Sequence, residues 1–389
     1  MHQLLTDVQR TRYEEFTQFV ASNVEPHAAL WEQQQQLPLD VVARMASAGF
    51  LGASLPVEFG GQGWDFVTFG LLNEAFGKAS SSLTGVLTVQ AMVAMALVKW
   101  GTKSQKAEWL PRLASGDLIA SIALTEPTGG SALRAMQTRY SWSPARDSLR
   151  LNGTKRWISC AQQAGVYLVY GQLDGQPVAC LVPRESVGLS VKPITDLMGF
   201  RAAGLAQLDF DNVELPAANI VGKPGFGLSH VAQVSLHHGR ISTACSALGL
   251  LRGCFEESIA HASQRRIESQ SVGEFGMIRT LIARMGTDLA AASGVCYLAC
   301  RAEDDRDPQS FTNALIAKYF TSQAAVRAAS DAVQIRGASG CHESSPTARY
   351  YQNAKIMEII EGTTQIHEEL LGSIFVHQAG LLARSSGTV

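Results

Sequence analysis

The chain has 389 residues, of which 46 % are hydrophobic and 17 % are charged, and its formal net charge is −2. This length exceeds that of one typical domain, and the charged share lies below the usual figure of about 25 %, so we expect two or three packed domains with apolar surface left for other subunits. The sequence contains no basic block, which argues against nucleic acid as a partner.

Two further classes of protein are disfavoured. The amino terminus carries charges such as Asp7 and Arg10 rather than an apolar leader, and the most apolar early stretch, 86–100, is interrupted by Gln90 and Lys99 and is short for a membrane span. We therefore expect a cytoplasmic protein that does not cross a membrane. The seven cysteines are odd in number and form no CxxC pair, so buried free thiols are expected rather than a metal site.

Helical periodicity covers residues 1 to about 118, where an apolar run that begins at Leu83 stops at Gly101. The middle of the chain changes to short strands. Apolar segments such as 119–124 and 208–215 alternate with the turn pairs Asn152-Gly153 and Asp174-Gly175. This pattern predicts a small antiparallel β-barrel or sandwich.

Helical periodicity returns after residue 226. Long apolar-rich segments predict a four-helix bundle with helices at 229–262, 275–301, 310–336 and 350–376. The predicted fold class is therefore α+β, with an N-terminal α-helical domain at 1–118, a middle antiparallel β-barrel domain at 119–226 and a C-terminal four-helix bundle at 227–389.

The common nucleotide-binding and hydrolytic motifs are missing from the sequence. It has neither a Walker loop nor a GxGxxG that opens a helix after a strand, and neither a GxSxG elbow nor an HExxH zinc motif. A flavin site outside these motifs is the more interesting candidate, and three stretches could contribute to it.

The first stretch, Ala123 to Ser131, reads Ala-Leu-Thr-Glu-Pro-Thr-Gly-Gly-Ser. A strand ends at a hydroxyl residue and a Pro/Gly turn lets backbone amides point outward, which suits a ring carbonyl or a phosphate. The second stretch, Lys155 to Ser159, places Trp157 and Ser159 on one face, so that an indole could cover a flat ring beside a hydroxyl. Taken singly, each pattern is also that of an ordinary turn or a core tryptophan.

The third stretch is Ile359-Ile360-Glu361-Gly362-Thr363-Thr364-Gln365-Ile366. A carboxylate between two isoleucines and a glycine, where long helices meet, is costly unless it is used. Exposed glutamates in loops are common, so this pattern alone leaves both interpretations open.

In this order, and on this background of helices, strands and long helices, the three stretches resemble the acyl-CoA dehydrogenase family. The resemblance covers nearly the whole chain. It extends to Met198-Gly199-Phe200-Arg201, the strand-to-proline passage 208–216, Gln334-Ile335-Arg336-Gly337 and Glu361-Gly362-Thr363. It implies a flavoprotein with FAD as cofactor, an oxidoreductase that acts on CH–CH groups.

In that family FAD lies between the barrel and the carboxyl-terminal bundle and crosses a subunit interface. By motif, the residues expected at the flavin ring and the pyrophosphate are Leu124, Thr125, Ser131, Trp157 and Ser159, with Ser131 at the pyrophosphate, Trp157 over one flavin face and Ser159 near N5. Those expected at the nucleotide end are Arg265, Gln334 and Gly337 from a neighbouring subunit, and Thr363 and Gln365 from the same subunit. A homo-oligomer, a dimer or a homotetramer, is therefore implied.

The resemblance also implies the reaction. A base removes the proton α to a thioester carbonyl, and the β-carbon gives a hydride to flavin N5. Glu361 matches the base, and its backbone amide matches one of two hydrogen-bond donors to the enolate-like oxygen. Burial beside Ile359 and Ile360 is expected to raise its pKa toward neutrality. One branch of the family carries the base on an earlier helix, where this chain has Gly239, and Arg240 matches an arginine that supports the base region.

Several positions depart from the family pattern. Ala132 replaces an aspartate after the turn serine, and His237 stands for an acidic residue near the place where acyl-CoA enters. The usual Arg-x-x-Phe-Gly lacks its aromatic residue at 265–269, and the usual Arg-Asp-Ala-Lys is Gln-Asn-Ala-Lys at 352–355. These changes leave the chemistry intact. They modestly favour an acyl group on acyl carrier protein, as in relatives from specialised-metabolite pathways, over the close alternative of an acyl-CoA substrate.

Two other functions stay open. A flavin oxidase or monooxygenase on the same fold would react directly with oxygen, although many such relatives lose the catalytic glutamate. A non-catalytic scaffold would keep the fold without binding FAD. The resemblance implies an electron-transfer flavoprotein as electron acceptor, and the length of the acyl chain cannot be read from the sequence.

Overall fold

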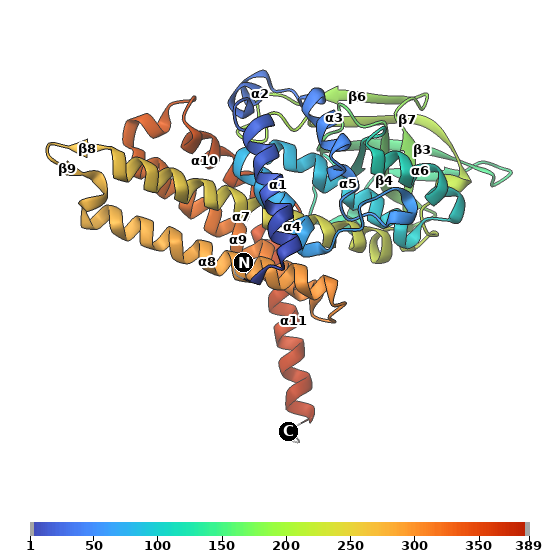
Figure 1. Cartoon of the computed structure of the whole chain (residues 1–389). Helices are drawn as coiled ribbons and strands as arrows, with labels where there is room; N and C mark the ends of the chain where they lie inside the picture. The colour runs from blue at the N-terminus through green and yellow to red at the C-terminus, as the bar shows by residue number, and fades with distance from the viewer. Residues whose placement is uncertain (1–3, 386–389) are drawn as a thin grey trace.

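The structure is a computed structural model that describes the backbone of residues 4–385 and the side chains of residues 4–378. Its body is elongated, with helices at one end and a curled sheet at the other, and the last helix projects from the middle of the body (Figure 1). The N-terminal helices are α1 (Asp7–Asn23), α2 (Ala28–Gln34), α3 (Leu39–Ser47), α4 (Phe66–Ala79), α5 (Ser81–Trp100) and α6 (Lys103–Ser115).

Side-chain caps explain where several of these helices begin. Thr6 and Thr102 form capping boxes with Gln9 and Gln105 at the start of α1 and α6, and Asp65 caps α4. Each cap satisfies backbone N–H groups that the first helical turn leaves free. These local signals therefore set where α1, α4 and α6 begin.

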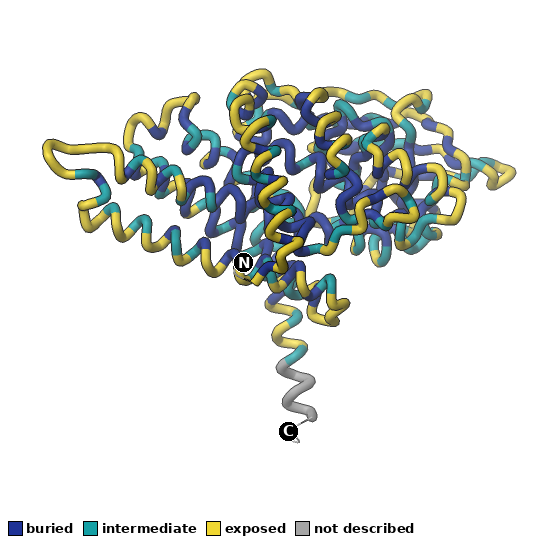
Figure 2. The backbone as a smooth tube through the Cα atoms, in the orientation of Figure 1, coloured by how far each residue is buried: buried dark blue, intermediate teal, exposed yellow. Residues whose placement is uncertain are grey.

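The apolar stretch near residue 90 forms a longer helix than the sequence indicated. α5 extends over 20 residues, so by length and apolarity it could cross a membrane, but 83 % of its most apolar window is buried inside the protein. It packs against α4, α7 and the sheet, and Figure 2 shows the buried segments gathered along the middle of the body. α5 is therefore a core helix that joins the N-terminal helices to the rest of the chain.

The middle of the chain forms one seven-stranded sheet. Its strands are β1 (Ala120–Ala123), β2 (Arg139–Trp142), β3 (Ser148–Ile158), β4 (Val166–Leu173), β5 (Gln176–Pro183), β6 (Leu189–Pro193) and β7 (Ala206–Pro216). The order is β1-β4-β2-β3-β7-β6, with β5 paired to β4. The predicted β domain is confirmed, but β1 and β2 both pair with β4 in parallel, so the sheet is not purely antiparallel.

The two predicted turns had different outcomes. Asp174-Gly175 does connect β4 to β5, and both residues have the positive φ of a type I′ turn. The prediction for Asn152-Gly153 was wrong, because both residues lie inside β3, where the register shifts between Leu151 and Gly153. Gly153 is needed there because a Cβ would stand 2.8 Å from Thr138 Cα.

The C-terminal helices begin with a π-helical turn at Gly227–Ala232. They are α7 (Gln233–Gln264), α8 (Gly276–Asp304), α9 (Ser310–Arg336), α10 (Pro346–Met357) and α11 (Thr364–Ser385), and a two-stranded hairpin, β8 (Arg266–Ile267) and β9 (Gln270–Ser271), joins α7 to α8. The first three predicted helices are confirmed. The fourth, 350–376, is divided into α10 and the projecting α11 by a turn over residues 358–363.

Candidate active site

The turn between α10 and α11 carries Glu361. The backbone of Glu361 is left-handed, with φ +55°, and Gly362 follows with φ +100°. A left-handed conformation costs a residue with a Cβ roughly 1–2 kcal/mol, so surrounding contacts must hold the turn in place. The sequence motif thus marks a strained position rather than an ordinary loop glutamate.

The carboxyl group of Glu361 is enclosed, although the residue as a whole is half-buried. Its Oε2 is buried and has no hydrogen-bond partner among the described residues. Burial raises the pKa of Glu361 to about 7, while the positive charges of Arg240 and Lys318 act to lower it. The carboxylate can therefore accept a proton near neutral pH, as a general base must.

Arg240 lies on α7 with only 7 % of its surface exposed. Its guanidinium stands 5.4 Å from the ring centroid of Phe311, the second residue of α9. Burial lowers the pKa of Arg240 and the charge of Glu361 raises it. The two predicted catalytic residues are thus within electrostatic reach of each other, on different elements.

Sequence reasoning missed Lys318, the third charged group at this place. Lys318 lies on α9 with no exposed surface, and its Nζ donates to the backbone carbonyls of Gly362 at 2.6 Å and Glu358 at 3.3 Å. A single lysine in the apolar run Ala314 to Phe320 was the available signal, because a charged side chain on a buried helix face needs a partner.

The first predicted flavin stretch, Ala123 to Ser131, is held to β3 by main-chain and side-chain hydrogen bonds. Leu124 and Thr125 come directly after β1. The Lys155 Nζ donates to the Leu124 carbonyl at 2.9 Å, and the Arg156 N–H donates to the Thr125 carbonyl at 2.9 Å. Lys155 also forms an ion pair with Glu126 at 2.9 Å, and both side chains are buried.

Glu126 organises the loop that follows. Its carboxylate accepts the backbone N–H groups of Gln137 and Thr138 at 2.6 and 2.9 Å. Burial acts to raise the pKa of Glu126, but these bonds and the one from Lys155 lower it to about 2. Sequence reasoning gave no role to this buried pair, which holds both predicted flavin stretches in register.

The residues of these stretches leave a surface that a flat ring could use. Trp157 is 46 % exposed and left-handed at φ +62°, with the Arg156 guanidinium 4.8 Å from its ring centroid. Ser159 follows β3, and its carbonyl accepts a hydrogen bond from the Ser121 hydroxyl. Ser131 is exposed, and a Cβ on Gly129 nearby would meet nothing within 4 Å. An exposed indole beside open backbone fits the flavin of FAD.

The residues predicted for the nucleotide end divide into two sets. Thr363 and Gln365 lie beside Glu361, at the start of α11. Arg265, Gln334 and Gly337 are exposed where α7 and α9 end, beside the β8–β9 hairpin and at the opposite end of the bundle from the sheet (Figure 1). One chain does not bring this second set to its own Glu361.

His237 pairs with Glu303 at the corner between α8 and α9. The His237 Nε2 lies 2.8 Å from Glu303 Oε2, and the Ser310 hydroxyl donates to the same oxygen. Burial acts to raise the pKa of Glu303, but bonds from His237 and Ser310 lower it to about 2. Glu303 thus places a carboxylate beside the position where the family pattern has an acidic residue.

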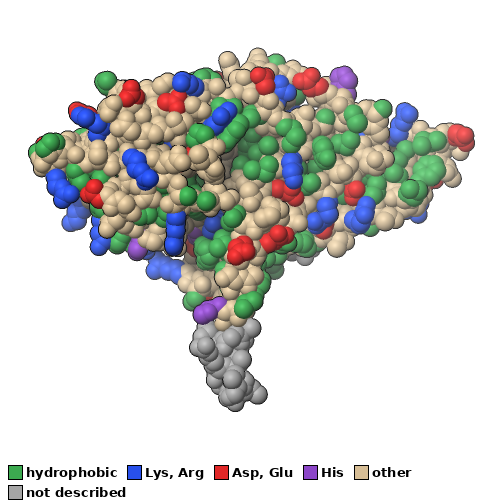
Figure 3. Space-filling view, turned by 180° about the vertical axis from the view of Figure 1, so that it is seen from behind, with side chains coloured by type: hydrophobic (Ala, Val, Ile, Leu, Met, Phe, Trp, Pro, Cys, Tyr) green, Lys and Arg blue, Asp and Glu red, His purple; other side chains and the backbone are tan. Residues whose placement is uncertain are grey.

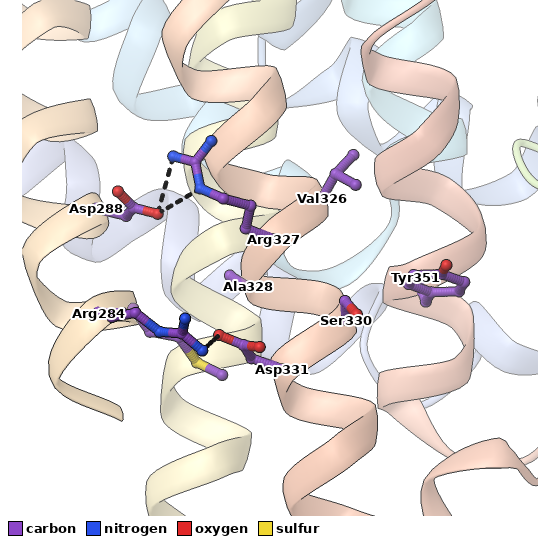
Figure 4. Close-up of a pocket in the computed structure, with 9 residues that line it drawn as sticks. Arg284, Asp288, Val326, Arg327, Ala328, Ser330, Asp331 and Tyr351 are labelled. Atoms are coloured by element: carbon purple, nitrogen blue, oxygen red, sulfur yellow. Dashed lines mark hydrogen bonds and ion pairs between the residues drawn. The ribbon is translucent and has the colours of Figure 1, made fainter. Parts of the chain in front are cut away.

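A surface pocket of about 360 Å³ lies among α8, α9 and α10, and none of the predicted site residues lines it (Figure 4). Two ion pairs line it, Arg284 with Asp331 at 3.2 Å and Arg327 with Asp288 at 3.0 Å. Each of these four charges is thereby compensated, and none of the residues proposed for catalysis faces the pocket.

The cysteines follow the prediction with one exception. Six are buried, and the Sγ atoms of Cys245 and Cys300 lie 3.8 Å apart, too far for a disulfide. Cys341 is exposed, at the end of the short helical turn that follows α9.

Sequence models of one family match three successive parts of the chain. They are described as the acyl-CoA dehydrogenase N-terminal domain at residues 6–117, the middle domain at 121–213 and the C-terminal domain at 227–374. The glutaryl-CoA dehydrogenase of Desulfococcus multivorans is 31 % identical over 362 residues, which cover 90 % of this chain and 92 % of that protein.

Solved structures share the whole fold. A glutaryl-CoA dehydrogenase from Mycobacterium smegmatis in complex with FADH2 has a TM-score of 0.91 at 27 % identity, over 96 % of both chains. A chain of a structure described as the electron transferring flavoprotein of Acidaminococcus fermentans has a TM-score of 0.92 at 29 % identity, over 95 % of this chain and 98 % of that one. FkbI, described as acting in biosynthesis of a methoxymalonyl extender unit for a polyketide, has a TM-score of 0.86 at 30 % identity, over 94 % and 99 %.

The matched domains follow one another in the order of the observed helical, sheet and helical parts, and together they cover most of the chain. The chain therefore belongs to the acyl-CoA dehydrogenase family and is an oxidoreductase that acts on CH–CH groups.

Proposed function

We propose that the protein catalyses the FAD-dependent α,β-dehydrogenation of an acyl thioester, with Glu361 as the base that removes the α-proton. The observation that carries this proposal is the enclosed, unpartnered Oε2 of Glu361 together with a pKa raised to about 7. A buried carboxylate without a hydrogen-bond donor is costly in a purely structural role, whereas a base needs a free oxygen.

The backbone around Glu361 supports a second part of the reaction. None of the described residues accepts a hydrogen bond from the Glu361 backbone amide. A free amide beside the base can donate to the thioester oxygen as negative charge develops there, which lowers the barrier to loss of the α-proton. The positive charges of Arg240 and Lys318 oppose the effect of burial on the pKa of Glu361, so a substantial fraction of the carboxylate is ionised at neutral pH.

FAD, when bound, would accept the hydride from the β-carbon. The residues that would hold it are Leu124, Thr125, Ser131, Trp157 and Ser159, because they form the open surface beside β1 and β3 described above. The buried Lys155–Glu126 pair would keep the two stretches aligned for the ring. The likeness to the glutaryl-CoA dehydrogenase in complex with FADH2 supports this assignment.

A homo-oligomer would complete the nucleotide end of the site. Arg265, Gln334 and Gly337 lie too far along the bundle to serve their own subunit, so we propose that they serve a neighbour. α11 leaves the body with Phe375 and Val376 exposed, and hydrophobic side chains are also exposed over one face of the body (Figure 3). Both surfaces would be covered by other copies of the chain.

The carrier of the acyl group and the electron acceptor are further parts of the proposal. We propose a pantetheine thioester on acyl carrier protein, because the chain departs from the acyl-CoA dehydrogenase pattern at Ala132 and His237. The 30 % identity with FkbI, which is described as acting in biosynthesis of a polyketide extender unit, supports a biosynthetic substrate. This would place the enzyme in a specialised biosynthetic route, with coenzyme A as the carrier to test against. An electron-transfer flavoprotein is the proposed acceptor.

The decisive experiment adds acyl-CoA and acyl-carrier-protein thioesters to the yellow protein without oxygen and follows the visible absorbance of the flavin. Bleaching by one of them is expected, and it names the carrier. Glu361→Gln should retain FAD, and its rate of flavin bleaching should fall by several orders of magnitude. Near-normal turnover in this variant would contradict the assignment of Glu361 as the base. A protein that holds FAD, is bleached by no thioester and is rapidly reoxidised by air would point instead to an oxidase.

A further inference from the structure

Lys318 is a buried lysine on α9 whose ammonium donates hydrogen bonds to the turn between α10 and α11. It lies in the first half of α9, with Ala317 and Thr321 beside it equally inaccessible to solvent. An ammonium group taken out of water is costly unless strong acceptors replace the water. Here the acceptors are two backbone carbonyls, Gly362 at 2.6 Å and Glu358 at 3.3 Å.

These two carbonyls stand on either side of Glu361 in the chain. The backbone N–H of Thr364 donates to the Glu358 carbonyl as well, at 3.1 Å, so that carbonyl is held by both α9 and the start of α11. Between the two anchored carbonyls, Glu361 keeps its left-handed backbone. The bonds from Lys318 therefore act on the segment that decides where the Glu361 side chain points.

We propose that Lys318 is a positioning residue for Glu361. Its ammonium fixes the turn 358–363 so that the carboxylate lies beside Gly239, and its charge favours the ionised form of that carboxylate. This inference rests on the proposed role of Glu361 as the base.

The charges around Glu361 show why Lys318 matters among them. Burial raises the pKa of Glu361 to about 7, against the opposing effects of Arg240 from α7 and Lys318 from α9. His367 faces the same turn from α11, and burial lowers its pKa to about 4, so it is neutral at pH 7. Tyr170 approaches from β4 as an uncharged phenol, because burial raises its pKa.

The same charged groups also act on the pKa of Lys318. Burial lowers its pKa to about 8, while the carboxylates of Glu361 and Glu358 oppose that shift and Arg240 adds to it. At pH 7 the turn is thus flanked by two cations. Only Lys318 also bonds the backbone on both sides of Glu361, so its removal is expected to affect both the protonation and the placement of the base.

The test follows flavin reduction by a thioester in anaerobic rapid mixing, from about pH 5.5 to about pH 9, so that the ionisation of the base sets the acidic limb of the profile. In Lys318→Met the midpoint of that limb should move up by about one pH unit, because a nearby positive charge is lost. The limiting rate should fall by roughly tenfold or more, because the carboxylate is less well placed. Lys318→Arg, which keeps the charge, should leave the midpoint near that of the wild type and lower the rate.

Lys355 provides the matched control. It is 53 % exposed and binds the carboxylate of Glu358 from the outer side of the same turn. Lys355→Met removes a positive charge without touching the carbonyls that Lys318 binds, so the midpoint and the rate should stay those of the wild type. FAD absorbance and thermal unfolding, measured on each variant, show whether the fold and the cofactor are retained.

The outcomes separate the inference from the proposed function. A wild-type protein that no thioester reduces, or a fully active Glu361→Gln, would overturn both. With those two controls as expected, a folded and FAD-loaded Lys318→Met with an unchanged midpoint and rate would overturn the role of Lys318 alone. If this variant does not fold, Lys318→Gln replaces it, and failure of both to fold would assign Lys318 to the stability of the bundle and reject the proposal.

Discussion

The carboxylate of Glu361 fills the space that a side chain on Gly239 would need. A Cβ at position 239 would stand 2.2 Å from Glu361 Oε2 and 3.0 Å from Met92 Sδ. Helix α7 therefore makes room for a base that is presented by a turn 122 residues later in the chain (361 − 239). The two positions cannot both carry a side chain in the observed arrangement.

Gly239→Ala should separate activity from stability. The new methyl group meets the far end of a flexible side chain, so Glu361 can rotate away and thermal unfolding should change by only a few degrees. The displaced base should reduce the rate of flavin reduction by roughly tenfold to a hundredfold. Gly294→Ala on α8 is the control, because its Cβ meets nothing within 4 Å. A wild-type rate in Gly239→Ala would contradict the proposed placement.

Glu361→Gln should become more stable than the wild type as pH rises. The pKa of Glu361 is about 7 in the folded protein, above its ordinary value of 4.5, so the folded state binds the proton more tightly than the unfolded chain does. The associated stability is complete below about pH 4.5 and is lost as pH rises through about 7. Glutamine avoids this loss, which is on the order of 3 kcal/mol at about 1.4 kcal/mol per pKa unit. Urea unfolding at about pH 5 and about pH 8 measures the difference, and an equal gap at both would refute the enclosed-carboxylate interpretation.

Lys155→Met should weaken FAD binding indirectly, because Lys155 holds the protein segments that are proposed to contact FAD. It leaves Glu126 buried without its partner, which typically costs about 3–5 kcal/mol, and it frees the Leu124 carbonyl. We expect a lower unfolding temperature and loss of FAD on gel filtration, measured from the visible absorbance. Lys192→Met on β6 is the control, because Lys192 is 63 % exposed and an ion pair made by such a solvent-exposed lysine is worth about 0–1 kcal/mol. Full FAD content in Lys155→Met would show that the pair does not hold the flavin stretches.

His237→Asp should destabilise this chain, although it restores an acidic residue at that position. The new carboxylate would face Glu303, whose oxygen already accepts bonds from His237 and Ser310. Like charges in this half-buried corner repel, so thermal unfolding should occur several degrees lower at neutral pH. Adding Glu303→Gln should recover part of the loss. Independent, additive effects of the two substitutions would show that the residues are not coupled.

The sequence predicted what depends on local pattern and missed what depends on distant partners. The helix–sheet–helix order and the turn at Asp174-Gly175 follow from periodicity and turn chemistry. The role of Glu361 came from the resemblance to a known family, because its local composition alone left both interpretations open. The parallel pairing of β2 with β4 leaves no local trace, and Asn152-Gly153 has the composition of a turn but lies in a bulged strand. Its place is decided by pairing with β7, which only the fold supplies.

The same distinction holds at the site. Glu361 was found because its motif resembles that of a known family, whereas the groups that enclose its carboxylate, Gly239, Arg240 and Lys318, lie on other helices. Its sequence neighbour Ile359 is 51 % exposed, so it does not supply the predicted burial. Lys318 and Lys155 were missed because each acts on carbonyls or carboxylates that lie 29 to 44 residues away. A lysine in an apolar run signals that a partner exists, but it does not say which one, since the partner is set by how helices and strands pack.

Cys341 gives the protein a natural attachment point for a spectroscopic probe. It is the one exposed thiol among the seven cysteines, all of which lie in the described part of the chain. A thiol-reactive dye should therefore label a single position without any engineering. That position follows Gly337 at the end of α9, where the bundle is proposed to receive the nucleotide end of a neighbour's FAD. Energy transfer between the dye and a bound flavin would then report assembly directly, as a distance between subunits.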